Sequence, residues 1–125
     1  MSSGERLESE CWETWKEGDL TVQKIKRYAT IDAQSARDSL AHIADLNKGG
    51  RYPLLVDLRE PASVSSEARA IFAGEEAALS NTRVALVQGS TVTALAGNLF
   101  VKLNRSKVET KIFTDETAAR KWLAR

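Results

Sequence analysis

Three serines and one aspartate form the stretch of the sequence that could carry chemistry. Asp57 follows the apolar run Leu54-Leu55-Val56, and Ser63, Ser65 and Ser66 come shortly after it. A serine at a helix start can accept hydrogen bonds from free backbone N–H groups, and a phosphate there is favoured by the helix dipole. The three serines are therefore either a phosphoacceptor or anion site, or ordinary helix caps.

Asp57 lies where a predicted buried strand ends. Open α/β sheets usually bind their ligands at the carboxyl ends of the strands. The Asp57 carboxylate could therefore accept hydrogen bonds from a ligand. Alternatively, it could pin the following loop by bonding backbone N–H groups, which is a common role of aspartate in turns.

The other reactive side chains lack partners in the sequence. Cys11 is the only cysteine and His42 the only histidine, whereas a zinc site needs three or four ligands and a reactive thiol needs a cationic neighbour. No phosphate-binding glycine loop, dinucleotide fingerprint or nucleophile elbow occurs. We therefore predict no catalytic residue, metal or cofactor, with His42 solvated on its helix and Cys11 buried as a small hydrophobe.

Composition limits the class of protein. The chain has 125 residues, with 18 Lys and Arg against 17 Asp and Glu and a formal net charge of +1. Nucleic-acid binding needs a clustered positive surface, so nucleic acid is not expected as a partner. The polar first residues predict neither a signal peptide nor membrane insertion. We expect one cytoplasmic domain over residues 1–125, with residues 1–6 disordered.

The N-terminal part predicts a β-hairpin over about 7–16 and 19–28. Its first strand places Trp12 on one face and Trp15 on the other, because side chains alternate along a strand. One face would meet the core, and the other would carry exposed aromatic surface. Trp12 and Trp15 are accordingly the predicted self-association surface.

Strands then alternate with amphipathic helices. A continuous apolar run predicts a strand covered on both faces, and apolar residues three and four apart predict a helix packed on the sheet. The order β-β-α-β-α-β-α-β-α predicts an α/β fold with a mixed five-stranded sheet and right-handed crossovers. The predicted strands after the hairpin are 54–56, 83–87 and 110–113. The predicted helices run from Thr30 or Asp32 to Asn47, from Ser63 or Ser65 to about 73, from 75 to 79, from 90 to 103, and from Thr114 onwards.

Several of these segments resemble the STAS family (sulfate transporter and anti-sigma factor antagonist). More closely, they resemble small bacterial STAS/SEC14-like (SpoIIAA-like) proteins of unassigned function. The resemblance covers most of the chain after about Tyr28. It is carried by Leu54-Leu55-Val56-Asp57-Leu58, Ser65-Ser66-Glu67-Ala68-Arg69, Val84-Ala85-Leu86-Val87, the segment 96–104 and the segment 110–123.

The resemblance implies two classes of function. In anti-sigma antagonists a kinase phosphorylates a serine at a helix start and so breaks a protein complex. Here Ala62-Ser63-Val64-Ser65-Ser66 replaces the family's Asp-Ser-Ser/Thr-Gly pattern, so only the location is carried over. We expect a non-enzymatic regulatory or protein-interaction module, possibly a homodimer. The alternative is a SEC14-like pocket for a small apolar or lipid-like ligand, lined by Phe72, Phe100 and Trp122.

Overall fold

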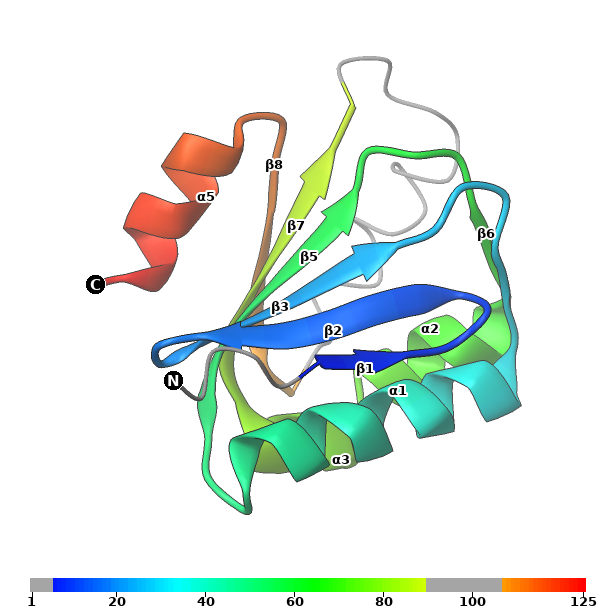
Figure 1. Ribbon diagram of the computed structural model, residues 1–125, viewed down its shortest axis with the longest axis horizontal. Coiled ribbons are helices and arrows are strands. Elements are labelled where there is room, and N and C mark those ends of the chain that lie inside the picture. Colours follow the sequence, from blue (N-terminus) through cyan, green and yellow to red (C-terminus); the bar gives the residue numbers. More distant parts are fainter. Residues whose placement is uncertain (1–5, 90–106) are drawn as a thin grey trace.

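A six-stranded mixed sheet forms the centre of the protein. The computed structural model describes residues 6–89 and 107–125 (Figure 1). The strand order is β1-β2-β3-β5-β7-β8; β1–β2 and β2–β3 pair antiparallel, and the remaining neighbours pair parallel. The strands are β1 (Arg6–Glu8), β2 (Trp12–Glu17), β3 (Leu20–Ile25), β5 (Tyr52–Leu58), β7 (Asn81–Gln88) and β8 (Glu109–Phe113).

The sixth strand corrects the prediction of five. The stretch expected to form one strand at about 7–16 is divided into β1 and β2 by a tight turn. In this turn the Ser9 hydroxyl accepts hydrogen bonds from the backbone N–H groups of Cys11 (3.0 Å) and Trp12 (3.3 Å). A side chain that bonds the backbone locally competes with the strand ladder, and alternation alone does not reveal it.

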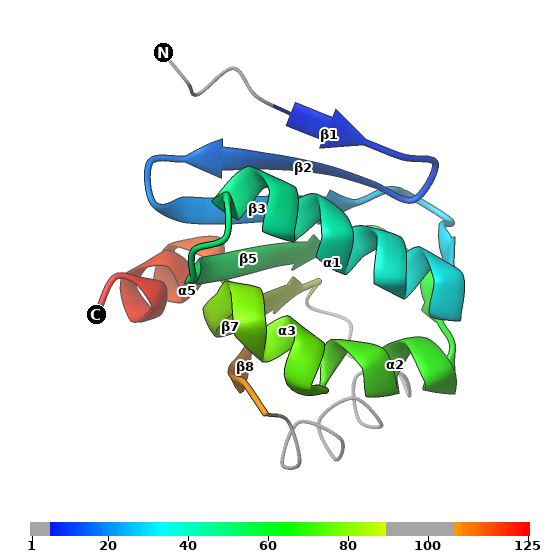
Figure 2. The same ribbon diagram turned by 90° about the horizontal axis from the view of Figure 1, so that it is seen from below.

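Helices cover both faces of the sheet. Figure 2 shows α1, α2 and α3 on one face and α5 on the other. The helices are α1 (Ala33–Asn47), α2 (Ser66–Phe72), α3 (Glu75–Ser80) and α5 (Glu116–Leu123). The helix predicted over 90–103, which includes Phe100, lies outside the described residues. The α/β architecture with helices packed on a mixed sheet is confirmed.

Capping residues set the helix bounds. Asp32, one of the two caps predicted for α1, accepts a hydrogen bond from the N–H of Ser35 at 2.9 Å. After the helix, Lys48 and Gly49 take left-handed backbone angles, with φ of 51° and 83°, as is common where helices end. Asp115, rather than the predicted Thr114, caps α5 by accepting from the N–H groups of its first turn.

The two apolar runs form the enclosed strands β5 and β7. Alternate residues of each run enter different apolar clusters, so both faces of these strands are covered. Val56 and Leu86 are each only 8% exposed. The α1-side cluster comprises Trp12, Ile25, Ala29, Ile31, Ala36, Ile43, Leu54, Val56, Ala68 and Leu86. The α5-side cluster comprises Val22, Leu55, Ala85, Val87, Ala119, Trp122 and Leu123.

A second, two-stranded sheet joins two loops at the carboxyl ends of the parallel strands. It pairs β4 (Thr30–Ile31) with β6 (Ser63–Val64) in parallel. The N–H of Ser63 donates to the carbonyl of Ala29 at 2.9 Å, and the N–H of Ser65 donates to the carbonyl of Ile31 at 2.9 Å. These bonds hold the loop after β3 against the loop after β5, and the candidate site is built on them.

Candidate functional site

Asp57 stands at the carboxyl edge of the sheet and holds the loop that follows β5. Its Oδ1 accepts from the backbone N–H of Arg59 (3.0 Å) and from the Arg59 Nε (3.0 Å). Its Oδ2 accepts from the Arg59 Nη2 at 2.8 Å. These bonds are those of a carboxylate that pins a loop. A role for Asp57 in ligand binding stays a prediction.

The charge state of Asp57 follows from two opposing effects. Partial burial raises the pKa of the carboxyl group, because it disfavours the charged form. The hydrogen bonds from the Arg59 side chain and backbone, together with the positive charges of Arg59 and Lys24, outweigh burial and hold the pKa of Asp57 below its ordinary value. In return, the Asp57 carboxylate raises the pKa of Arg59. The pair therefore stays charged at neutral pH.

From Arg59 a chain of ion pairs continues along α5 to β2. Arg59 donates to Glu116 at 2.8 Å, and Arg120 donates both to Glu116 (2.7 Å) and to Glu17 (2.9 Å). Glu17 also accepts from the Trp15 Nε1 at 2.8 Å, and this bond and the bond from Arg120 lower the pKa of Glu17. Each carboxylate of this chain already has a cationic partner, so the chain tethers α5 rather than providing an unpaired base.

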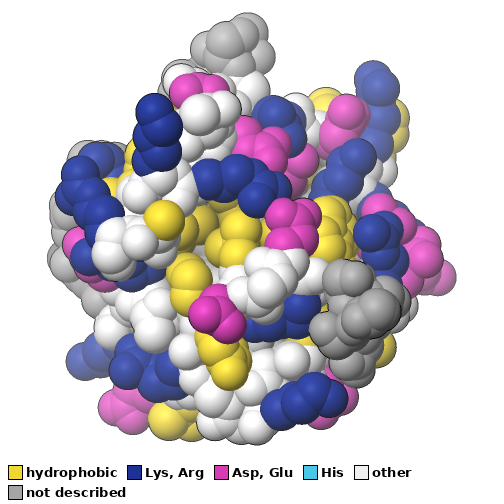
Figure 3. Space-filling view, turned by 60° about the vertical axis from the view of Figure 1, so that its left-hand side comes forward, with side chains coloured by type: hydrophobic (Ala, Val, Ile, Leu, Met, Phe, Trp, Pro, Cys, Tyr) yellow, Lys and Arg dark blue, Asp and Glu magenta, His cyan; other side chains and the backbone are white. Residues whose placement is uncertain are grey.

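Figure 3 shows the side of the molecule on which α5 and the β2–β3 turn lie. Hydrophobic side chains gather in the middle of this face, and charged side chains of both signs surround them. Trp15 and Leu20 are partly buried against the α5-side cluster, and the Arg6 guanidinium lies 4.4 Å from the Trp15 ring. Of the two predicted self-association residues, Trp15 is therefore half-covered by side chains of its own chain.

Trp12, the second of these residues, lies in the core. It is 1% exposed, because α1 packs across the face of β2 that carries it. Its Nε1 donates to the Nδ1 of His42 at 3.2 Å, with the two rings edge to face at 5.8 Å. The structure thus places Trp12 away from any surface, and the expected aromatic patch of Trp12 and Trp15 is not formed.

The same contact corrects the expectation that His42 is solvated. His42 is half-buried, and its Nδ1 accepts the hydrogen bond from the Trp12 indole. A buried tryptophan usually finds an acceptor for its N–H. That rule could have drawn attention to the single histidine, but the sequence does not indicate that α1 crosses β2 at this point. Cys11 is half-buried, and its thiol lies 3.5 Å from the Thr30 carbonyl.

The three candidate serines occupy different positions. Ser65 is the N-cap of α2, and its Oγ accepts from the N–H of Ala68 at 3.1 Å. Ser66 is the exposed first residue of that helix. Ser63 is exposed in β6. The capping alternative therefore describes Ser65 in this structure, whereas phosphorylation of any of the three stays a prediction.

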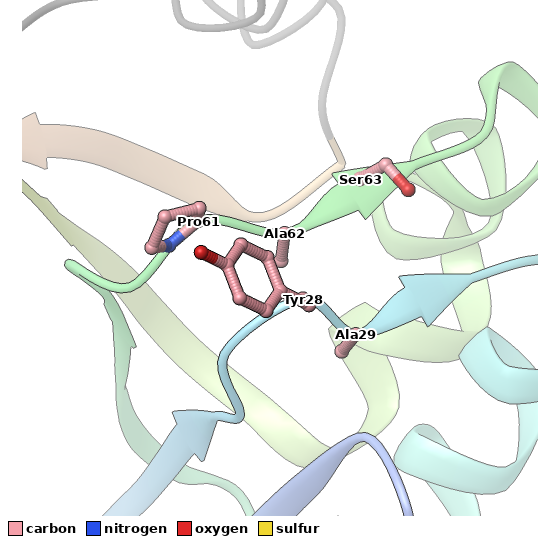
Figure 4. Close-up of a pocket in the computed structure, with 5 residues that line it drawn as sticks. All are labelled: Tyr28, Ala29, Pro61, Ala62 and Ser63. Carbon is pink, nitrogen blue, oxygen red and sulfur yellow. The ribbon is translucent and has the colours of Figure 1, made fainter.

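A shallow depression of about 270 Å³ lies beside the β4–β6 sheet (Figure 4). Figure 4 shows the Tyr28 ring beside Pro61 and Ala62, with its hydroxyl end toward Pro61. The backbone N–H of Tyr28 donates to the Pro61 carbonyl at 2.5 Å. The residues that line the depression are Tyr28, Ala29, Pro61, Ala62 and Ser63. Ser63 is the predicted site residue that the structure brings into this depression.

Tyr28 is the residue of this site that the sequence did not reveal. It was expected at the end of a strand, but β3 ends at Ile25 and Tyr28 is 71% exposed in the turn that follows. Its backbone φ is 63°, at the third position of a turn closed by a 3.2 Å bond from Ala29 N–H to the Lys26 carbonyl. Glycine or asparagine normally occupies such a position. Neither is present, so the usual turn signal is missing.

The residues predicted to line an apolar pocket are separated by the sheet. Phe72 is partly buried against the α1-side cluster. Trp122 is buried in the α5-side cluster, where its ring centroid lies 5.7 Å from that of Phe113. Phe100 lies outside the described residues. Phe72 and Trp122 therefore do not line a common pocket in this structure.

A polar cluster is buried at the opposite, amino edge of the parallel strands. Asn47 accepts hydrogen bonds from Lys16 (2.9 Å) and Thr21 (2.7 Å) and donates to the Ser80 carbonyl (2.8 Å). The Lys16 ammonium also lies 3.7 Å from the centre of the Tyr52 ring. Burial lowers the pKa of Lys16, although nearby Asp19 opposes the shift. All of these groups are satisfied by one another, so the cluster joins α1 to the sheet.

Two further properties hold for residues 6–89 and 107–125. Within these ranges no helix is long and apolar enough to cross a membrane. Nor do three His, Cys, Asp or Glu side chains within them stand close enough together to hold a metal ion.

Comparison with known proteins places the chain in a family. A family described as a domain of unknown function, DUF7793, matches residues 14–125. The chain belongs to this family. A search of curated proteins gave no match.

The DUF7793 chain is also similar to a solved structure. This is an uncharacterized protein of the DUF3478 family, with a SpoIIAA-like fold, from Shewanella loihica PV-4. The TM-score is 0.62 at 18% sequence identity, with 98% of each chain covered. At this identity the likeness concerns the fold alone, and it confirms the SpoIIAA-like resemblance found in the sequence.

Proposed function

We propose that the protein is a non-enzymatic regulatory module that binds another protein through the carboxyl edge of its sheet. The observation that carries this proposal is Tyr28. Its side chain is 71% exposed, its backbone φ is 63°, and it stands over a depression. These three properties together distinguish it from Leu79, the other large hydrophobic side chain described as equally exposed.

The backbone of Tyr28 has an energetic cost. A residue with a Cβ loses about 1–2 kcal/mol in the left-handed region, because the Cβ approaches the following carbonyl oxygen. Residues held in such conformations cluster at binding and catalytic sites. Unlike Lys48, which has the same backbone at the end of α1, Tyr28 is not explained by a helix end. Here the bonds of Tyr28 and Ser63 to the facing loop hold the turn in place. The geometry keeps the aromatic ring outside the core, where a partner can reach it.

The chemistry of this edge suits protein binding. Tyrosine and arginine are enriched among the residues that dominate interface energies. Tyr28 has Arg27 beside it, with the guanidinium 5.0 Å from the ring centre. Pro61 and Ala62 add apolar surface beside the Tyr28 ring. A non-enzymatic role is supported by the pairing of Asp57 and Glu116 with Arg59, which leaves these carboxylates without a free role as acid or base.

Ser63 supports the regulatory part of the proposal. It is exposed and lines the same depression as Tyr28. A phosphate on its hydroxyl would add about two negative charges to an apolar contact, which opposes binding by desolvation. We therefore expect Ser63→Asp to weaken the interaction and Ser66→Asp, at an exposed position outside the depression, to leave it unchanged.

Site-specific photo-crosslinking tests the proposal. Benzoylphenylalanine is placed at Tyr28 in one variant and at Leu79 in a matched control, and both are irradiated in cells. We expect a discrete covalent adduct from position 28 that Ser63→Asp reduces, and no discrete adduct from position 79. If position 28 gives no adduct, or if both positions give the same adducts, the proposed binding face is wrong.

A further inference from the structure

We infer that the protein bound at this edge is a second copy of the same chain, docked across a two-fold axis through Tyr28. The inference rests on the proposed function and adds the identity of the partner. A two-fold contact uses the same patch on both copies, so the patch must be complementary to itself. The Tyr28 patch, defined as Arg27, Tyr28, Glu60, Pro61 and Ser63, meets this requirement in shape and in charge.

The shape of the patch provides a projection and a recess side by side. The projection is the Tyr28 ring, and the recess is the depression of about 270 Å³ formed by Tyr28 with Ala29, Pro61, Ala62 and Ser63. The depression is shallow and open, so an aromatic ring of a second copy can lie against its lining residues from outside. Across a two-fold axis each Tyr28 ring can lie over the depression of the other copy, where the two rings pack against each other in an offset arrangement.

The charges of the patch are complementary to themselves as well. Arg27 and Glu60 have opposite signs, and their side chains are 62% and 44% exposed. Their atoms are 3.7 Å apart, a looser pairing than the 2.8 Å between Arg59 and Asp57. A two-fold contact brings Arg27 of one copy toward Glu60 of the other on both sides of the axis. No like charges then accumulate, and a loosely held pair can exchange partners between the copies.

In this dimer the contact lies at the Tyr28 patch and not at Trp12 and Trp15, the residues expected from the sequence. Trp12 is buried, and Trp15 is partly buried against the α5-side cluster with the Arg6 guanidinium near its ring. Leu79 is exposed on α3, but it does not belong to the depression at Tyr28. The Tyr28 patch combines an exposed aromatic ring, a recess and a matched pair of charges.

Charge exchange between two variants tests the contact. Sedimentation velocity over micromolar to millimolar concentrations should show that the wild-type chain dimerises. Arg27→Glu and Glu60→Arg should each weaken the dimer roughly tenfold or more, because both then place like charges across the axis. An equimolar mixture of the two variants should dimerise close to the wild-type affinity, because in the mixed pair opposite charges again face each other on both sides.

A second pair of variants separates association from folding. Tyr28→Asn removes the ring but suits a left-handed backbone, so the dimer should be lost while the thermal unfolding midpoint stays the same or rises. Leu79→Ser, which removes the other exposed side chain, should leave the dimer unchanged. A wild-type chain that stays monomeric, a mixture of charge variants that stays monomeric, or a dimer that survives Tyr28→Asn overturns the inference. If the wild type is monomeric but position 28 still crosslinks to a different protein, the proposed function stands and only the second-copy inference fails.

Discussion

Replacement of Asn47 by leucine should destabilise the protein strongly, because Asn47 connects three parts of the fold. It is 3% exposed in the last turn of α1. Its Oδ1 accepts from Lys16 of β2 and Thr21 of β3, and its Nδ2 donates to the Ser80 carbonyl at the end of α3. Leucine has the same number of side-chain heavy atoms and the same branching as asparagine, but no polar atoms. The substitution therefore removes all three bonds and leaves their partners inside the protein.

The expected loss can be worked out bond by bond. A neutral hydrogen bond contributes about 1 kcal/mol, so the bonds to Thr21 and Ser80 account for about 2 kcal/mol. The bond from Lys16 involves a charge, but Lys16 is partly solvated and keeps the Asp19 carbonyl and the Thr21 hydroxyl as acceptors. We assign it about 1 kcal/mol rather than the larger values found for charged bonds. The total loss in free energy of unfolding is about 3 kcal/mol.

Urea denaturation followed by circular dichroism measures this loss. The matched control is Arg37→Leu, on the exposed side of the same helix, where the side chain makes no hydrogen bond or ion pair with any described residue. The control should change the free energy of unfolding by less than about 0.5 kcal/mol. If Asn47→Leu costs less than about 1 kcal/mol, then the buried cluster does not stabilise the junction of α1 with the sheet, and the bond-by-bond reasoning is refuted.

Three further predictions concern the candidate site and the buried tryptophan. Ser65→Ala should lower the free energy of unfolding by about 1 kcal/mol through loss of the α2 cap, and no measurable loss in a urea titration would show that the cap is dispensable. Arg59 holds the pKa of Asp57 below its ordinary value, which is about 3.9 in an unfolded chain. The ionised Asp57–Arg59 pair therefore stabilises the fold fully above this unfolded pKa. The stabilisation is lost as the pH falls through the lower pKa of the folded state. The difference in stability between wild type and Asp57→Asn should therefore be constant at neutral pH and shrink below about pH 4, and a difference independent of pH in acid titrations would contradict the assignment. Trp12→Phe should cost about 1–3 kcal/mol in thermal or urea unfolding, because it leaves a void and removes the donor to His42, whereas a neutral result would show that the core adapts.

Much of the candidate site could not be predicted from the sequence. Asp57 was correctly located at the end of β5, and Ser65 was one of the two predicted helix starts. Tyr28 was missed because no glycine or asparagine marks its turn. Its exposure depends on the pairing of β4 with β6, whose residues lie more than thirty positions apart in the chain. Only the folded chain places the depression beside Ser63.

The sequence by itself determined most of the longer strands and helices of the described residues and their order, but not the division of β1 from β2 or the short strands β4 and β6. The apolar runs at 54–56 and 83–87 lie in β5 and β7, where strands covered on both faces take apolar residues at successive positions. The apolar spacing in α1 was sufficient to predict that helix, and of the two caps predicted for its start, Thr30 and Asp32, the structure selects Asp32. The likeness to SpoIIAA-like proteins was carried in part by the same apolar runs, and the fold confirms it.

Tertiary structure decided which of these faces are covered and which are exposed. Alternation shows that Trp12 and Trp15 lie on opposite faces of β2, but only the packing of α1 shows that Trp12 is the buried one. The ion pair of Glu17 with Arg120 joins residues 103 positions apart, and no local pattern indicates such a pair. The physical reason is that periodicity depends on neighbours within a turn or a strand, whereas burial and pairing depend on groups that meet only after the chain has folded.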